Sequence, residues 1–432
     1  MNKVIDKKYL LPFILVTCCF ALWGFANDIT NPMVKAFSKI FRMSVTDGAL
    51  VQLAFYGGYF CMALPAALFV RKFSYKAGLL MGLGLYAVGA LMFIPAQATG
   101  SYYPFLIAYF VLTCGLSFLE TTANPYVLSL GDKETATRRL NLAQAFNPIG
   151  SLAGMFVAMQ FIQAKLNPLS TEERALLTDD QFEAVKSADL AVLSRPYVII
   201  GAVLVVFFLV ILLFVKTQEK AQKNGMDQKF GPTVKRLWQN KPYRYGVVAQ
   251  FFYVGVQIMC WTFIIQYGTR VFMNEGMTEQ AAEVLSQRYN IVAMAIFCVS
   301  RFICTFLLKY IQPSKLLTYL GLAGAVLVLE VIFLDGRAGM VCLVAVSACM
   351  SLMFPTIYGI ALTDTGEDAK LGAAGLIMAI LGGSVLPPLQ ARIIDGSGLG
   401  SIPAVNLSFV LPLLCFVIIV LYGCFITKTE KS

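Results

Sequence analysis

The chain has 432 residues, of which 58% are hydrophobic and only 13% are charged. Soluble domains average about 25% charged and about 45–50% apolar residues, so this composition excludes an ordinary soluble protein and indicates a polytopic membrane protein. The net charge of +10 could suggest nucleic acid, but the basic residues fall mostly in loops on one side of the predicted membrane spans. We therefore expect the lipid bilayer as the surrounding partner, and no nucleic acid.

Histidine is absent from the chain. Any proton relay must therefore use carboxylates, and metal sites built on histidine are excluded. The eleven cysteines lie in apolar segments without a CxxC pair, which is typical of small buried side chains rather than of a disulfide or zinc framework. Nothing resembles a phosphate-binding glycine loop or a nucleophile elbow. The sequence predicts no enzyme, no catalytic residue, no metal site and no cofactor.

Twelve apolar runs have the length of about 20 residues that a helix needs to cross the hydrocarbon core. They cover residues 10–38, 46–70, 77–96, 102–130, 138–165, 196–216, 244–272, 284–309, 315–334, 339–363, 371–394 and 404–427. The first run is too long for a signal-peptide core, so we interpret it as a retained span. The alternate loops that would lie inside hold roughly twice as many Lys and Arg residues as the others, which predicts that both termini are cytoplasmic.

Two of the loops are long. Residues 166–195 are acidic and would lie outside, with one or two short surface helices; residues 217–243 are polar and basic and would lie inside. The second loop divides the chain into an N-terminal six-helix bundle (1–216), a cytoplasmic linker (217–243) and a C-terminal six-helix bundle (244–432). Two parallel halves of six spans describe the major facilitator fold, in which the substrate site lies between the halves.

One carboxylate, Glu120, lies inside the fourth span, in the segment GLSFLETTANPYV. No charged residue occurs from Tyr102 to Leu119. A charge at mid-membrane depth costs at least ~2.5–3.5 kcal/mol, so such residues usually face a cavity and serve transport. Asn124 lies one helical turn further along the same face, and Pro125 can break the backbone hydrogen bonding beside it. The alternative is a protonated glutamate with only a structural role.

The first span contains the polar segment WGFANDITNPM. Asn27 and Asn31 are four residues apart and share a face, and Asp28 and Asn31 are three apart. Buried amides and a carboxylate on one stripe offer the donors and acceptors that a polyhydroxylated ligand requires. The alternative is that these side chains hold helices together, as polar groups also do in membranes.

The fifth span opens with RRLNLAQAFNPIG, in which Asn141, Gln144 and Asn147 recur at every third residue. They predict a slowly turning stripe of amides that follows the Glu120 span in sequence. Pro148 and Gly150 should loosen the helix backbone at this point.

The seventh span places Gln250 and Gln257 seven residues apart, close to one face, with Tyr253 and Trp261 near that face. Amides beside aromatic planes suit sugars, whose rings present hydroxyl edges and apolar faces. An aromatic interface belt explains Trp261 less well, because this residue lies well inside the span.

Three further features concern the C-terminal half. The Pro and Gly residues of SLMFPTIYG and AILGGSVLPPLQ predict bent helices in the tenth and eleventh spans. Arg301, in the eighth span, should reach the inner membrane surface by snorkelling, so we favour a structural role for it.

The chain resembles the L-fucose/proton symporter family of the major facilitator superfamily. Nine segments carry this resemblance across both halves, namely FALWGFAN, AFYGGYF, FSYKAG, FLETTANPY, RLNLAQAFN, AQFFYVGVQ, CWTFIIQY, MSLMFPTIYGI and ILGGSVLPP. By resemblance, Glu120 matches the protonatable glutamate on the fourth span of the family. Gln144 and Asn147 match amides of the fifth span that face the sugar cavity.

One position departs from the family pattern. The first-span aspartate of the family falls where this chain has Asn31, and the chain has its aspartate at Asp28, where an amide is expected. The two positions differ by about 4.5 Å along a helix and by about 60° around it. The carboxylate should therefore remain in the cavity, with Asp28 as a second candidate for proton coupling.

The resemblance implies a proton-coupled symporter that imports a neutral hexose by alternating access, with L-fucose as the favoured sugar. Glu120 and Asp28 would couple the proton. Candidate sugar ligands are the amides and aromatic residues Asn27, Asn31, Asn124, Gln144, Asn147, Gln250, Tyr253, Gln257 and Trp261. The alternatives are a glucose/galactose importer of the same family and an exporter of amphipathic compounds. We expect a monomer in the bacterial inner membrane.

Overall fold

The computed structural model describes residues 5, 9–30, 33–43, 50–169, 171–214, 230–334, 336–363, 365–396, 398–400 and 402–429. Within these ranges twelve helices, single or in consecutive pieces, are long and apolar enough to cross a membrane. The described residues contain no β-strand, and their β pairing is limited to an isolated bridge between Leu399 and Ile402. The prediction of an all-α protein with twelve spans is confirmed.

The chain forms two compact units, and each is described by itself. The N-unit comprises residues 7–126 and 149–227, and the C-unit comprises residues 1–6, 127–148 and 228–432. The predicted division into domains at 217–243 stays a prediction, and residues 217–229 of that linker lie outside the described ranges.

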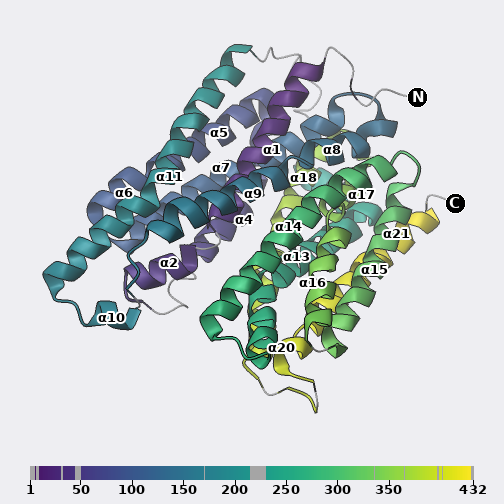
Figure 1. Cartoon of the computed structure of the whole chain (residues 1–432). Helices are drawn as coiled ribbons and strands as arrows, with labels where there is room; N and C mark the ends of the chain where they lie inside the picture. Colours follow the sequence, from purple (N-terminus) through teal and green to yellow (C-terminus); the bar gives the residue numbers. More distant parts are fainter. Residues whose placement is uncertain are drawn as a thin grey trace. The chain divides into compact units, whose positions relative to one another are not determined.

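The helices of the N-unit are coloured purple to teal in Figure 1. They are α1 (Leu10–Thr30), α2 (Met33–Ile40), α4 (Leu50–Lys72), α5 (Tyr75–Leu91), α6 (Phe93–Thr99), α7 (Tyr102–Ser129), α9 (Asn147–Val157), a π-helical turn (Ala158–Ile162), a 3-10 turn (Gln163–Lys165), α10 (Thr171–Ala175) and α11 (Asp179–Phe214). The last residues of α7 and the first two of α9 belong to the C-unit.

Close backbone contacts through glycine hold the N-unit helices together. At Gly115 of α7 a Cβ atom would collide with the main chain of Tyr86 on α5, and at Gly150 of α9 it would collide with the main chain of Ala21 on α1. Small residues let membrane helices approach in this way and gain van der Waals contact that lipid cannot replace. The α5 helix also packs along α11 (Figure 1). The helices α1 and α7, which carry candidate carboxylates, are therefore fixed by their backbones.

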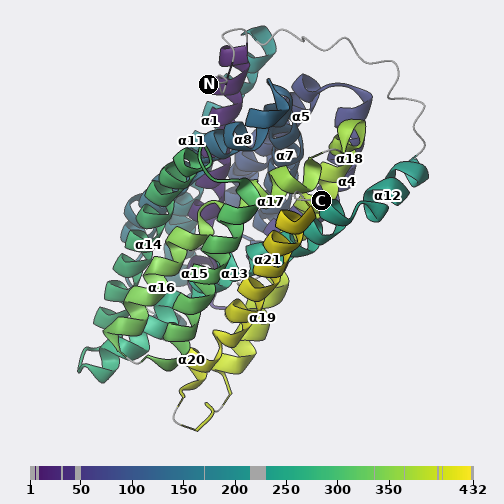
Figure 2. The ribbon, with the colours of Figure 1, turned by 90° about the vertical axis from the view of Figure 1, so that its right-hand side faces the viewer.

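The C-unit contains the remaining helices. They are a 3-10 turn (Lys133–Thr135), α8 (Ala136–Gln144), α12 (Phe230–Gln239), α13 (Lys241–Asn274), α14 (Glu279–Leu307), α15 (Pro313–Phe333), α16 (Arg337–Met350), α17 (Met353–Leu362), a 3-10 turn (Gly366–Asp368), α18 (Ala369–Met378), a 3-10 turn (Ala379–Leu381), α19 (Gly382–Ile394), α20 (Ala404–Leu407) and α21 (Val410–Thr429). In both Figure 1 and Figure 2 α15 runs beside α21, and α13 packs against α14, α16, α17, α19 and α21.

Several C-unit spans are broken, as their Pro and Gly residues predict. The tenth span is divided into α16 and α17 at residues 351–352, ahead of Pro355, and the eleventh is divided into α18, a 3-10 turn and α19. The fifth span is likewise divided into α8 and α9, just before Pro148. Proline has no backbone N–H and clashes with the preceding turn, so the main-chain carbonyls at such a break need other partners.

The acidic loop of residues 166–195 differs in part from its prediction. One short helix, α10, lies in it, but the second surface helix is continuous with the sixth span as α11, which runs for 36 residues through Pro196. A buried ion pair joins the extended part of α11 to the loop, because Arg174 contacts Asp189 of α11 at 2.6 Å, with exposed fractions of 0% and 2%. Asn167 also donates its main-chain N–H to Asp189, at 2.8 Å. These contacts give the loop an interior of its own.

Candidate functional site

Glu120 lies on α7 and is fully buried. Neither oxygen of its carboxyl group has a hydrogen-bond partner among the described residues. The helix continues through Pro125 to Ser129, although Pro125 has no N–H to donate to the preceding turn. Asn124 is also fully buried, and its side-chain amide donates to the main-chain carbonyl of Glu120 at 3.0 Å. The amide therefore bonds the backbone of the glutamate and leaves its carboxyl group to other partners.

An aromatic side chain of α4 lies near this carboxyl group. The Tyr59 hydroxyl, on α4, lies close enough to interact electrostatically with Glu120 and faces the indole N–H of Trp23 on α1. The hydroxyl of Ser117, one turn before Glu120, donates to the main-chain carbonyl of Tyr59 at 3.1 Å and so fixes α4 against α7. Tyr59 of α4 thus lies between Glu120 on α7 and Trp23 on α1. Sequence reasoning missed Tyr59 and Trp23, because an aromatic residue in an apolar span resembles any other core residue.

The polar segment of α1 is only partly described. Asp28 is 9% exposed, and the Tyr56 hydroxyl of α4 lies close enough to interact with its charge. Asn27 is half-buried. Asn31, a predicted sugar ligand, lies outside the described residues. Both candidate carboxylates are therefore buried near a tyrosine hydroxyl of α4, at Tyr56 and Tyr59.

A second group of hydroxyls lies at the end of α1. Tyr109 donates to the hydroxyl of Tyr197 at 2.8 Å, and Tyr197 reaches the main-chain carbonyl of Ile29 at 3.4 Å and the Thr30 hydroxyl at 3.5 Å. The Tyr197 ring stacks on Phe93, with 4.1 Å between ring centroids. These contacts hold the end of α1 beside α7 and α11. Spacing gave no signal for them, because the two tyrosines are 88 residues apart.

The amides of the fifth span lie in the C-unit, at the break between α8 and α9. Gln144 ends α8 and is 2% exposed, while Asn147 begins α9 and is half-buried. Asn141 is fully buried, and its amide donates to the Thr137 carbonyl at 2.9 Å and to the Thr356 hydroxyl of α17 at 3.4 Å. The stripe is therefore divided, with Asn141 engaged in helix packing and Gln144 and Asn147 on either side of the break.

The four predicted residues of the seventh span lie along α13. Gln250 is fully buried, and neither its amide oxygen nor its amide nitrogen has a hydrogen-bond partner among the described residues. Tyr253 donates to the main-chain carbonyl of Met350 at 3.0 Å. Trp261 donates to the Ser347 hydroxyl at 3.2 Å.

Gln257 and Trp261 are half-buried, whereas Gln250 and Tyr253 are fully buried. Gln257 and Trp261 therefore present accessible surface from α13, which a sugar ligand needs. The Tyr253 hydroxyl is used within the protein, at the place where α16 ends.

Arg301 on α14 occupies the interior of the C-unit. The expectation that it snorkels to the surface is wrong, because it is 3% exposed. Its guanidinium donates to the main-chain carbonyl of Ser351 at 2.5 Å and to that of Gln144 at 3.0 Å, and lies 4.6 Å from the ring centroid of Phe297. Both acceptors lie at helix breaks, where carbonyls are left over and the helix dipole is negative. Two helix ends thus balance the charge of Arg301.

Taken together, the candidate groups of the two units are carboxyls, amides, hydroxyls, indoles and the guanidinium of Arg301. Carboxyls can take up and release a proton, and amides with an indole can hydrogen-bond and stack on a neutral polyhydroxylated ligand. The part of the chain that the structure describes contains no group of three or more His, Cys, Asp or Glu residues that could hold a metal ion.

Comparison with known proteins gives consistent matches over the whole chain. The model of the Major Facilitator Superfamily matches residues 16–388. The L-fucose-proton symporter of Haemophilus influenzae is 50% identical over 429 residues, which cover 98% of this chain and 97% of that protein. The glucose/galactose transporter of Brucella abortus is 28% identical over 426 residues, with 98% and 96% covered.

A solved structure agrees with the sequence matches. The transporter FucP of the Major Facilitator Superfamily, in the outward conformation, matches with a TM-score of 0.84 and 32% identity over 97% of this chain and 99% of that chain. The predicted major facilitator fold is therefore confirmed, as is the prediction of a transporter rather than an enzyme. The chain belongs to the L-fucose–proton symporter family of the Major Facilitator Superfamily.

Proposed function

We propose that this protein imports a neutral hexose together with a proton by alternating access, and that the sugar is L-fucose. The observation that carries the proposal is the carboxyl group of Glu120, which is fully buried in a membrane span without a hydrogen-bond partner among the described residues. A charge in that place is costly, so the group favours taking up a proton before the protein closes around its substrate. The 50% identity to a protein named L-fucose-proton symporter supports the choice of sugar.

Glu120 is the proton carrier in this proposal, and Asp28 is the second coupling residue. Protonation of Glu120 removes the charge that opposes closure of a dry, occluded state. An inside-negative potential of 100 mV adds ~2.3 kcal/mol for each proton moved inward, which is enough to concentrate a neutral sugar many-fold. The Tyr56 and Tyr59 hydroxyls of α4 lie close enough to Asp28 and Glu120, respectively, to interact with the charge of each ionised carboxyl group.

The proposed sugar ligands are the amides and aromatic residues identified above. Gln257 and Trp261 support this role best, because they are half-buried and belong to the amide–aromatic pattern of α13. Gln144 and Asn147 flank the break between α8 and α9, and Gln250 has an amide without a partner among the described residues. Asn27, Asn31, Asn124 and Tyr253 complete the set. Asn124 and Tyr253 have supporting roles, because the Asn124 amide bonds the backbone of Glu120 and the Tyr253 hydroxyl bonds that of Met350.

A glucose or galactose importer is the second candidate, since the Brucella abortus relative is named a glucose/galactose transporter. Its lower identity, 28% against 50%, favours L-fucose. We further propose that the protein is a monomer in the bacterial inner membrane with both termini cytoplasmic, which the distribution of Lys and Arg supports.

The sugar is tested by offering labelled L-fucose, D-galactose and D-glucose to purified protein in vesicles with an imposed pH gradient. We expect accumulation of L-fucose, with alkalinisation of the external medium when the sugar is added. Preferential accumulation of D-galactose or D-glucose would show that the protein is the second candidate, a glucose or galactose importer. No response to any sugar would contradict sugar transport.

The coupling role is tested with Glu120→Gln in the same vesicles. The variant should lose accumulation driven by the pH gradient and still exchange labelled for unlabelled sugar. Glu330→Gln is the matched control, because Glu330 is a half-buried carboxyl in the ninth span that accepts a hydrogen bond from Cys342, and it should accumulate sugar normally. If Glu120→Gln still accumulated sugar in response to the pH gradient, the proposed role of Glu120 as proton carrier would be contradicted.

A further inference from the structure

The short helix α12 carries a row of exposed apolar side chains. Phe230, Val234 and Trp238 are 47%, 42% and 62% exposed. They follow one another at every fourth residue and therefore lie within a sector of about 80° on the helix surface. Single exposed apolar residues need no explanation, but an aligned row that ends in a tryptophan indicates a surface with a partner.

The other faces of α12 are different in character. Thr233 and Leu237 are buried against the C-unit, and Leu237 lies near Gly372 of α18. Lys235 and Gln239 are exposed on the far side. The helix thus has one face for the protein, one for an apolar partner and one for water, as a helix lying in a membrane interface requires.

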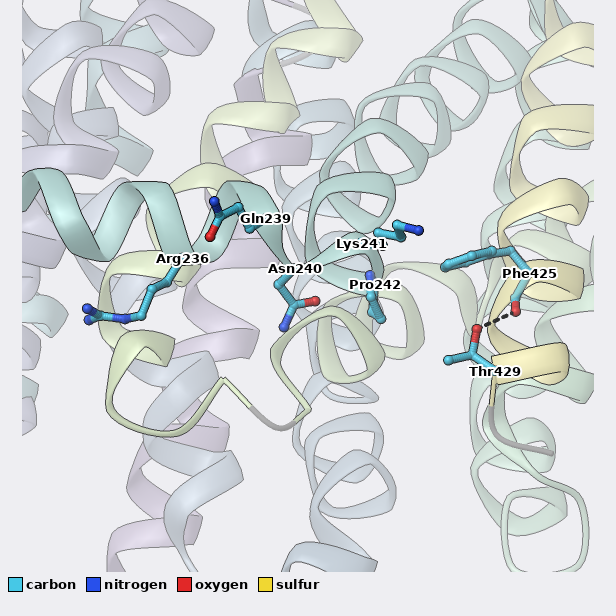
Figure 3. A pocket seen from close by; sticks show the side chains of 7 residues that line it. All are labelled: Arg236, Gln239, Asn240, Lys241, Pro242, Phe425 and Thr429. Atoms are coloured by element: carbon cyan, nitrogen blue, oxygen red, sulfur yellow. Dashed lines mark hydrogen bonds between the residues drawn. The ribbon is translucent and has the colours of Figure 1, made fainter. Parts of the chain in front are cut away.

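The position of α12 in the chain places it at the membrane boundary. It ends at Gln239, and the seventh membrane span begins at Lys241. The Asn240 side chain accepts a hydrogen bond from the main-chain N–H of Tyr243 at 3.0 Å, so it ends one helix and caps the next. Figure 3 shows α12 running across the view while α21 runs up it.

A pocket of about 570 Å³ lies beside this junction. Its lining includes the first residues of one span, Lys241 and Pro242, and residues from the end of another, Phe425 and Thr429. In Figure 3 the Lys241 and Phe425 side chains point toward one another. The pocket therefore combines an ammonium group with an apolar wall at the level where a span meets the headgroups of the lipids.

The cations near the pocket differ in their pairing. Arg236 makes a two-pronged ion pair with Asp368, at 2.9 and 2.8 Å, so its charge is already balanced. Lys241 and Arg244 make no ion pair with any residue that the structure describes. The Arg244 guanidinium lies 6.0 Å from the ring centroid of Trp238. Two unbalanced positive charges thus flank the exposed end of the apolar row.

We propose that α12 lies in the membrane interface and that, with Lys241 and Arg244, it binds the headgroup of an anionic phospholipid. The apolar row enters the boundary between headgroups and acyl chains, and the cations meet the lipid phosphate. If both termini are cytoplasmic, this lipid belongs to the inner leaflet.

The first test measures binding of phosphatidylglycerol to the full-length protein in detergent, by native mass spectrometry against phosphatidylcholine. The double variant Lys241→Gln with Arg244→Gln should weaken phosphatidylglycerol binding roughly fivefold for each cation removed. Lys235→Gln is the matched control, because Lys235 is an exposed lysine of the same helix that lies about 100° around it from the centre of the apolar row and does not line the pocket; this variant should bind as the unmodified protein does. Equal binding by the double variant and the control would contradict the proposal.

Two further measurements test the placement of α12 and the nature of the bound anion. In vesicles, lipids brominated near the headgroup should quench the fluorescence of Trp238. The contribution of Trp238 is the difference in fluorescence between the unmodified protein and Trp238→Phe. Absence of quenching would overturn the placement of α12 in the membrane interface. Inorganic phosphate at the same concentration as the lipid should not displace phosphatidylglycerol. Displacement by phosphate would show that the pocket takes a free anion and would overturn the lipid assignment.

Discussion

Each unit of the protein buries a group that could be charged, and the two groups are treated in opposite ways. In the N-unit, Glu120 has no hydrogen-bond partner for its carboxyl group among the described residues. In the C-unit, Arg301 donates to two main-chain carbonyls and stacks on Phe297. The glutamate can lose its charge by binding a proton, whereas an arginine cannot lose its charge in a protein. The group that can be neutralised lacks partners, and the group that cannot is provided with them.

The arginine partners show how a charge is accommodated in a membrane span without a carboxylate. The carbonyls of Gln144 and Ser351 are available because α8 and α16 end beside them. Arg139 is also bonded to a helix end. Its guanidinium donates to the main-chain carbonyls of Val127 and Leu128 at the end of α7, at 2.8 and 2.6 Å. A helix end carries a partial negative charge, so these arginines are balanced without a second titratable group.

Two separate variants, each of which neutralises one of these buried groups, test this contrast most directly. Arg301→Gln should lower the free energy of unfolding by about 3 kcal/mol, because two hydrogen bonds from a charged donor are lost and two buried carbonyls are left behind. Glu120→Gln should leave the thermal midpoint unchanged or higher, since no contact is removed. Thermal unfolding in detergent, followed by tryptophan fluorescence, measures both. A larger loss in Glu120→Gln would reverse the interpretation.

A conservative change at Arg301 sharpens the contrast. Arg301→Lys keeps the charge but replaces the planar fork with a single ammonium group, which cannot face both carbonyls as well. We expect about half the loss seen in Arg301→Gln, roughly 1.5 kcal/mol. The same unfolding measurement applies. If lysine and glutamine were equally disruptive, geometry rather than charge would account for the role of Arg301.

Removal of the Tyr253 hydroxyl tests whether the break between α16 and α17 needs a second hydrogen-bond donor besides Arg301. It donates to Met350, the last residue of α16, so Tyr253→Phe should cost about 1 kcal/mol. Tyr245→Phe is the matched control, because Tyr245 is 39% exposed and its hydroxyl accepts from Arg244 at the surface. The control should unfold within about 0.5 kcal/mol of the unmodified protein. If the two variants lost the same free energy of unfolding, the buried hydrogen bond of Tyr253 would stabilise the protein no more than the exposed one of Tyr245.

An exposed ion pair gives the smallest effect. A hydrogen bond from Arg337 lowers the pKa of the Glu275 carboxyl below its usual value of about 4.3. A lowered pKa means that the stabilisation is present above this value and is lost as the pH falls through the pKa of the folded protein. Between neutral pH and pH ~3, the midpoint of the unmodified protein should therefore fall slightly more than that of Glu275→Gln. Parallel curves would show that the pair contributes nothing.

Sequence reasoning found the features that depend on local pattern. Glu120 was identified because it interrupts an uncharged run, and the weak point of the fifth span because Pro148 has no backbone N–H to donate to the preceding turn. The partners of Arg301 could not be predicted in this way, since a main-chain carbonyl has no sequence identity and the two acceptors lie 157 and 50 residues away. Tyr59 was missed for a related reason: only the packing of α4 on α7 brings it to Glu120. The Arg174–Asp189 pair, which joins α11 to the loop before it, was missed because residue spacing does not reveal it.

The close contact at Gly150 limits how the protein can be redesigned. Engineers who wish to change the accepted sugar can vary Gln257 or Trp261, whose side chains are half-buried. Gly150 should be left out of any such library, because even the smallest side chain would meet the main chain of Ala21 on α1, the helix that also carries Asp28. A library that spares this position preserves the placement of Asp28 while the specificity changes.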